Sequence, residues 1–182
     1  MAMNKSNTKP ARRGDFTSAL PSTLYWDASF LVNAIYEHGT WHDECAAFAA
    51  RLDQSETISY VSTLALDETW FVLLQLLIGG DHPGIPFWRV LNDDRSVIST
   101  YVDRLEAITN DIYANPRIRV VSIASRASRL ALKNMREFHL LPRDAMHLAA
   151  MRQHKIEHIV TTDADLLTVS GISIYTCNPA LL

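Results

Sequence analysis

The chain has 182 residues, of which 48% are hydrophobic and 20% are charged, and this mix excludes wholesale disorder, collagen-like repeats and a coiled-coil rod. Seventeen Lys and Arg against 20 Asp and Glu give a net charge of -3, so the whole molecule is not a polycation, and two cysteines are too few for a disulfide scaffold. We therefore expect one ordinary domain in the reducing cytoplasm, with no apolar run long enough to span a membrane.

The first segment, residues 1–21, is polar, and its basic residues are not followed by the apolar run of a secretory signal. We predict that 1–21 is a flexible polar tail. A basic arm that touches nucleic acid is the alternative. Residues 22–182 are predicted to form a single domain.

Short apolar runs alternate with stretches of helical periodicity along 22–182. Strands are expected at 23–26, 57–61, 118–122, 158–161 and 172–175. Helices are expected just after residue 27 and at 41–52, 63–78, 87–113, 123–138 and 142–155, with Ser62 as the cap of the third. Strands that alternate with helices predict the α/β class, with a central, mainly parallel sheet of four to five strands.

Three aspartates lie at strand ends or in first helical turns. Asp27 and Asp163 each follow a buried strand directly, and Asp144 comes just after Pro142, where a helix begins. Because the carboxyl ends of parallel strands line one crevice, Asp27 and Asp163 are expected at the same edge of the sheet. Each aspartate has a plain alternative as a helix cap, since Asp favours that position and the positive end of the helix dipole.

Glu68 is the most informative acid, because the helix around it is apolar on nearly every side and is therefore predicted to be buried. A lone buried carboxylate costs several kcal/mol unless it is paired, protonated or bound to a metal. No lysine or arginine lies within a turn of it, so either a distant cation or a metal ion is needed. Convergent carboxylates favour Mg²⁺ or Mn²⁺. His147, three residues after Asp144, is either a ligand or proton shuttle, or a histidine that supports the ligands from behind.

Positive charge is concentrated between residues 117 and 155, which carry a net +7 while the remainder carries -10. Four basic residues of the helix expected at 123–138 fall within a stripe about 80° wide: Arg126, Arg129, Lys133 and Arg136. This stripe is either an ordinary solvated face or a track for phosphates beside the acids.

Four segments, in this order, resemble the motifs of PIN-domain nucleases, and within that family they look most like the VapC-like toxins of toxin–antitoxin pairs: LYWDASFLV at 24–32, STLALDE at 62–68, LPRDAMHLA at 141–149 and IVTTDADLL at 159–167. The resemblance implies a three-layer α/β/α fold and a metal-dependent endoribonuclease that uses Mg²⁺ or Mn²⁺. It also implies a small antitoxin that covers the groove, and a homodimer or a larger assembly.

The resemblance assigns roles to individual residues. Its catalytic and metal-binding acids are Asp27, Glu68, Asp144 and Asp163, with Asp165 as an additional ligand. Ser29 and Thr162 would support these ligands. Independently of the resemblance, the residues themselves predict that His147 supports the ligands and that the stripe together with Arg143 binds RNA.

The chain departs from the family pattern at Asp67, where an apolar residue is usual, and in the length of 79–115. Two other functions stay open. The chain could be a PIN-like module that binds nucleic acid without cleaving it. It could also be a phosphatase of the haloacid-dehalogenase kind, although that chemistry needs a second aspartate where Ser29 stands.

Overall fold

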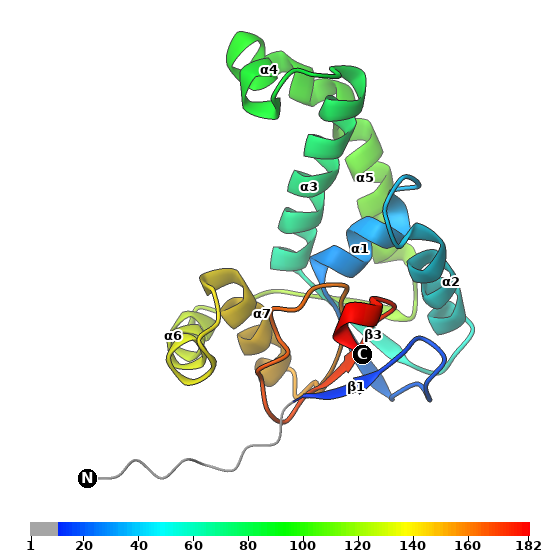
Figure 1. Ribbon diagram of the computed structural model, residues 1–182, viewed down its shortest axis with the longest axis vertical. Helices are drawn as coiled ribbons and strands as arrows, with labels where there is room; N and C mark the ends of the chain where they lie inside the picture. The colour runs from blue at the N-terminus through cyan, green and yellow to red at the C-terminus, as the bar shows by residue number, and fades with distance from the viewer. Residues whose placement is uncertain (1–10) are drawn as a thin grey trace.

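The structure is a computed structural model that describes residues 11–182, and its centre is a parallel sheet (Figure 1). Six strands form this sheet in the order β1-β6-β5-β2-β3-β4. Their bounds are β1 Arg12–Gly14, β2 Thr23–Trp26, β3 Ile58–Ser62, β4 Ile118–Val121, β5 His158–Val160 and β6 Ser173–Tyr175. The predicted α/β class is confirmed, with one strand more than expected.

Seven helices and two short 3₁₀ turns connect the strands. Their bounds are α1 Ala28–Ile35, α2 His42–Asp53, α3 Thr63–Asp81, α4 Phe87–Asp93, η1 Arg95–Ile98, α5 Ser99–Ala114, α6 Arg126–Phe138, α7 Pro142–Gln153 and η2 Pro179–Leu181. Figure 1 shows α6 and α7 together on one side of the sheet and α1, α2 and the foot of α3 on the other.

Alternation along the strands places side chains in two separate cores, one on each face of the sheet. In β2, Tyr25 packs against the α6–α7 side, whereas Leu24 and Trp26 pack against the side of α1, α2 and α3. The same alternation in β5 assigns Ile159 to the first core and Val160 to the second. The three-layer α/β/α arrangement is thus present.

Part of the predicted tail is folded. β1 pairs in parallel with β6, and the loop after it packs onto α2, where the ring of Phe16 stacks on Phe48 with centroids 4.1 Å apart. The Arg51 guanidinium holds the same loop by donating to the carbonyl oxygens of Phe16 and Ser18. The tail prediction is therefore wrong for 11–21, because pairing with a distant strand orders a segment that has little apolar character of its own. Of the basic arm proposed as the alternative for 1–21, Arg12 and Arg13 lie in β1, and residues 1–10 lie outside the described residues.

The longer stretch at 79–115 contributes most of a helical arm, defined here as residues 74–102, which points away from the sheet with α4 at its far end (Figure 1). The expected single helix at 87–113 is two helices, because the Asp94 carboxylate accepts the Ser96 N–H at 2.9 Å and starts the η1 turn between them. The arm has a small core of its own, formed around Ile78, Val90, Leu91 and Tyr101.

Among the described helices, α3 is long and apolar enough to cross a membrane, with 19 residues and a mean hydropathy of 1.2 over its best window. This qualifies the sequence prediction that no run reaches that length. The indication is weak, since core helices of soluble proteins have the same length and composition, and the first turns of α3 contribute Ala65 and Leu66 to the core beneath the sheet.

Candidate active site

A cavity of about 750 Å³ opens at the carboxyl end of β2, whose two neighbours in the sheet are β3 and β5. The chain leaves β2 into α1 and leaves β3 into α3, so side chains from several elements converge at this edge. All five acids that the sequence singled out line the cavity: Asp27, Glu68, Asp144, Asp163 and Asp165. The expectation that Asp27 and Asp163 meet at one edge of the sheet agrees with this placement.

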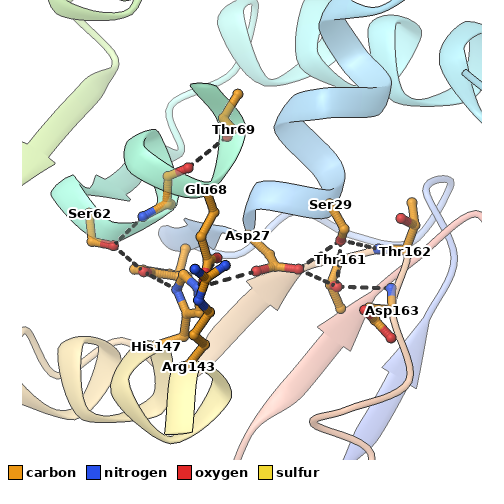
Figure 2. A network of polar contacts seen from close by, with 12 residues as sticks. Asp27, Ser29, Ser62, Glu68, Thr69, Arg143, His147, Thr161, Thr162 and Asp163 are labelled. Atoms are coloured by element: carbon orange, nitrogen blue, oxygen red, sulfur yellow. Dashed lines mark hydrogen bonds and ion pairs between the residues drawn. The ribbon is translucent and has the colours of Figure 1, made fainter. Parts of the chain in front are cut away.

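Asp27 occupies the N-cap position of α1, yet its side chain makes no capping hydrogen bond. Its Oδ2 instead accepts hydrogen bonds from the hydroxyls of Ser29, at 2.7 Å, and Thr161, at 2.8 Å (Figure 2). The cap alternative therefore does not describe Asp27. Two hydroxyls hold one of its oxygens, and the carboxylate faces the cavity.

The sequence prediction named Thr162 and did not name Thr161. Thr161 supplies the hydroxyl that contacts Asp27, and it also accepts the backbone N–H of Asp163 at 3.0 Å. Thr162 contributes its backbone N–H to the Ser29 hydroxyl at 3.1 Å, and its side chain is not part of the cavity lining. Because β5 ends at Val160, the direction of either threonine is set by the loop geometry, which the Thr-Thr pair does not reveal.

Glu68 lies one turn into α3, which begins where the Ser62 hydroxyl accepts the N–H of Ala65 at 3.1 Å, as predicted. The side chain is buried, and its Oε2 is 2.7 Å from His147 Nε2. Arg143 Nε lies 3.4 Å from Oε1. Both partners come from α7, far along the chain, so the distant cation considered from the sequence is present. Asp67 beside it is exposed.

A buried histidine and a buried tyrosine stand behind the acids. His147 Nδ1 is 2.7 Å from the Tyr25 hydroxyl, which is 2.6 Å from the Ser62 hydroxyl. Burial lowers the pKa of His147, but the hydrogen bond that its ring donates to Glu68 and the charges of Asp27 and Glu68 outweigh burial and raise this pKa above its ordinary value. Burial also raises the pKa of Tyr25, which stays protonated. The sequence prediction missed Tyr25, whose only signal was a polar hydroxyl on an otherwise apolar strand.

The remaining acids repel one another across the cavity. Burial, followed by the charge of Asp165, raises the pKa of Asp144 to about 6. Burial and the charges of Asp163 and Asp27 also raise the pKa of Asp165. The Asp163 carboxylate accepts the N–H of the next residue, Ala164, at 2.6 Å. The cavity therefore concentrates negative charge that the protein compensates only in part.

The sequence model of the PIN domain family matches residues 24–172. The chain belongs to the PIN domain family. This membership leaves no place for the haloacid-dehalogenase alternative, whose second aspartate is replaced here by Ser29. A search of curated proteins finds no match.

Solved structures similar to this PIN domain include a toxin and two toxin–antitoxin complexes. VapC20 of Mycobacterium tuberculosis, a toxin that cleaves the sarcin-ricin loop, has a TM-score of 0.55 and 16% identity, covering 81% of this chain and 98% of that one. VapBC2 of Rickettsia felis, bound to a DNA fragment from its promoter, has a TM-score of 0.53 and 9% identity, covering 85% and 98%. A toxin–antitoxin complex from Klebsiella pneumoniae has a TM-score of 0.45 and 14% identity, covering 82% and 94%. At these identities the likeness concerns the fold.

The donor set of this PIN domain fits a hard divalent cation. One ligand atom from each of Asp27, Glu68 and His147 lies within 4.8 Å of the other two. Glu68 Oε1 is buried and has no hydrogen-bond partner among residues 11–182, and Arg143 approaches it without hydrogen-bond geometry. A bound cation would satisfy such an oxygen. Asp144, Asp163 and Asp165 line the same cavity but stand outside this tight group.

The stripe on α6 is exposed at all four of its basic residues, while Ala127, Ala131 and Phe138 on the opposite side of the helix are buried against α7. The cavity lining includes Arg143 but no residue of the stripe. The structure thus separates the predicted RNA-binding residues into one at the cavity and four on a neighbouring helix.

Proposed function

We propose that this PIN domain is an endoribonuclease that depends on Mg²⁺ or Mn²⁺. The observation that carries the proposal is the group of acids at the carboxyl edge of the sheet, in which a buried oxygen of Glu68 lacks a hydrogen-bond partner. Asp27 and Glu68 would hold the cation together with Asp144, Asp163 and Asp165. The sarcin-ricin loop that VapC20 cleaves supports RNA as the substrate.

Each side chain then has a physical task. When bound, the cation neutralises charge at the scissile phosphate and lowers the pKa of a water molecule. Ser29 and Thr161 hold Asp27 in place through their hydroxyls. Asp144 or Asp163 would orient the attacking water. The water oxygen would bond to phosphorus while the P–O3′ bond breaks and the 3′ oxygen takes up a proton, which leaves a 5′-phosphate and a 3′-hydroxyl.

The basic residues would hold the RNA backbone. Arg143 lies at the cavity, where it can contact the phosphate next to the reacting one. The exposed stripe on α6 offers four cations to more distant phosphates, which adds affinity without sequence preference.

Cleavage of single-stranded and structured RNA, measured while Mn²⁺ is titrated, tests the proposal. Asp27→Asn should lower the rate at least about 100-fold, because a charged ligand is lost. The variant should still fold, and its melting temperature without metal should rise because repulsion among the acids is relieved. Cleavage by purified Asp27→Asn at the wild-type rate would contradict the mechanism.

The module that binds nucleic acid without cleaving it makes the opposite prediction. Its melting temperature would be the same with and without millimolar Mn²⁺, since a protein without a cation site gains nothing by mass action. A nuclease of the proposed kind should be stabilised by the cation.

We also propose that the nuclease is the cytoplasmic toxin of a type II toxin–antitoxin pair. Its fold is that of VapBC2, a toxin–antitoxin complex, which supports a small antitoxin that covers the cavity. Exposed aromatic side chains, such as Phe71 on α3 and Trp88 on the arm, whose ring centroids lie 6.1 Å apart, support a homodimer or larger assembly. The antitoxin is tested by whether a short neighbouring reading frame encodes a protein that blocks cleavage. The homodimer or larger assembly is tested by light scattering of the purified chain.

A further inference from the structure

Three side chains form a hydrogen-bonded chain behind the acids. Ser62, Tyr25 and His147 are all buried, with relative exposures of 0%, 0% and 2%. Successive contacts of 2.6, 2.7 and 2.7 Å lead from the Ser62 hydroxyl through the Tyr25 hydroxyl and the His147 ring to Glu68 Oε2. Water is excluded from this path, so each proton on it must be shared among these groups.

The donor-to-acceptor direction of these hydrogen bonds follows from Ser62. The Ser62 oxygen already accepts the N–H of Ala65 at the start of α3, and the Tyr25 oxygen is the only acceptor for the Ser62 proton among residues 11–182. If Ser62 donates to Tyr25, then Tyr25 donates to His147 Nδ1. The proton of the neutral imidazole ring is then on Nε2, where it points at the Glu68 carboxylate.

The opposite direction leaves two groups unsatisfied. The Ser62 proton would have no acceptor, which costs about 1–3 kcal/mol for a buried donor. The lone pair of His147 Nε2 would also face a Glu68 oxygen at 2.7 Å, where two acceptors repel each other. The first direction satisfies every group on the path.

We propose that Ser62 and Tyr25 place the proton of the neutral His147 ring on Nε2, so that His147 is a positioning residue that donates to Glu68 Oε2 and is not a ligand of the cation. The role in cation binding rests on the proposed function, whereas the position of the proton does not. Glu68 Oε2 is occupied by His147, which would leave Oε1, the buried oxygen that Arg143 Nε approaches to 3.4 Å without a hydrogen bond, for the cation. His147 belongs to the tight group by distance, but its nearest nitrogen is a donor.

The choice of metal follows from this assignment. With the imidazole excluded, the cavity offers oxygen ligands, chiefly carboxylates, which suit Mg²⁺ and Mn²⁺. An imidazole ligand would shift the preference towards Zn²⁺ and other borderline metals. The hydrogen-bonded relay formed by Ser62, Tyr25 and His147 would therefore act on the choice of metal as well as on the position of the Glu68 carboxylate.

The position of the proton can be measured directly. Long-range ¹H–¹⁵N spectra of the metal-free protein at alkaline pH, where the ring is neutral, distinguish the two tautomers, and His147→Gln identifies the signals. We expect the proton on Nε2 both before and after Mg²⁺ is added. A proton on Nδ1, or loss of the Nε2 proton when Mg²⁺ binds, would overturn the proposal.

A matched pair of tyrosine variants tests the positioning role. Tyr25 and Tyr60 are partners across the β2–β3 ladder, and the Tyr60 hydroxyl makes no hydrogen bond to residues 11–182. Tyr25→Phe should weaken Mn²⁺ binding about tenfold by calorimetry, and raise the Mn²⁺ concentration needed for cleavage equally, because a group that supports a ligand is lost. Tyr60→Phe should change neither.

The two proposals can fail separately. Equal Mn²⁺ affinity of Tyr25→Phe and the wild type would overturn the relay, even if both cleave RNA. A wild type that binds no Mn²⁺ would overturn the proposed function, and the tautomer spectrum of the metal-free protein would then decide the relay by itself.

Discussion

The two sides of the cavity hold their acids in different ways. Asp27 is fixed by two hydroxyls from other residues, and Glu68 is fixed by His147 from another helix. Asp163 and Asp165, on the loop after β5, are exposed, and the first is held only by a local backbone N–H. The fold itself therefore places Asp27 and Glu68. We expect Asp163 and Asp165 to reach their final positions only when a cation neutralises the repulsion among the carboxylates. The comparison teaches that acids of one cavity need not contribute equally.

Glu68→Gln should have the largest effect, compared with Asp67→Asn on the same turn of α3. Gln can still accept from His147, so the fold is retained, but the charge facing the cation is lost. We expect kcat to fall at least about 100-fold for Glu68→Gln. The side chain of Asp67 is exposed, so Asp67→Asn should leave kcat unchanged. Equal rates for the two variants in a steady-state assay would remove Glu68 from the site.

Asp165→Asn sharpens the comparison on the weakly held side. We expect a loss of about tenfold in cleavage rate, because one of several carboxylates near the cation is removed while the fixed pair remains. Stabilisation by Mn²⁺ should persist in thermal melts. If the loss matched that of Glu68→Gln, the distinction between the two sides would be wrong.

The stripe on α6 should matter less than the cavity. The double variant Arg129→Gln, Lys133→Gln should raise KM a few-fold at unchanged kcat, because it removes binding shared by substrate and transition state. The dependence of binding on salt should also weaken, by a slope of about 1. Arg89→Gln on the arm, which is equally exposed, serves as the control. A KM equal to the wild type in a low-salt assay would make the stripe an ordinary solvated face.

The smallest expected effect is on the pH dependence of stability without metal. The pKa of Asp144 is about 6 in the folded protein against an ordinary 3.8, so the folded state binds this proton more tightly than the unfolded state does. The melting temperature of the metal-free protein should therefore rise as the pH falls from neutrality through 6. Asp144→Asn should flatten this profile, and Mn²⁺ should reverse it by competing with the proton. An Asp144→Asn profile with the same slope as the wild-type profile would show that Asp144 does not cause this pH dependence.

Much of the site could be predicted from the sequence because it follows from local patterns. An acid directly after a buried strand, as at Asp27, must lie at the carboxyl edge, and an acid in an apolar helix, as at Glu68, must find a partner. The cap at Ser62 was recognisable because a serine directly before an apolar helix is also a local pattern.

The features that the sequence did not reveal depend on distant contacts. The choice between Thr161 and Thr162 depends on the path of one loop, and the role of Tyr25 depends on a histidine that lies 122 residues further along the chain. β1 exists because β6 is beside it, and three polar or small residues carry no strand signal of their own. The break between α4 and α5 is made by one Asp94 carboxylate within a continuous helical periodicity.

The small separate core of the arm has a consequence for how the molecule opens. Few contacts join Ile78, Val90 and Leu91 to the cores beside the sheet, so the arm should unfold as its own cooperative unit at a lower free energy than the rest. Amide hydrogen exchange should then be fastest in α4 and η1, while the first turns of α3, which carry Glu68, exchange only with global unfolding. A protease that cuts at the exposed Gly79–Gly80 pair would leave the cavity intact, and the nuclease could be studied as a nicked protein.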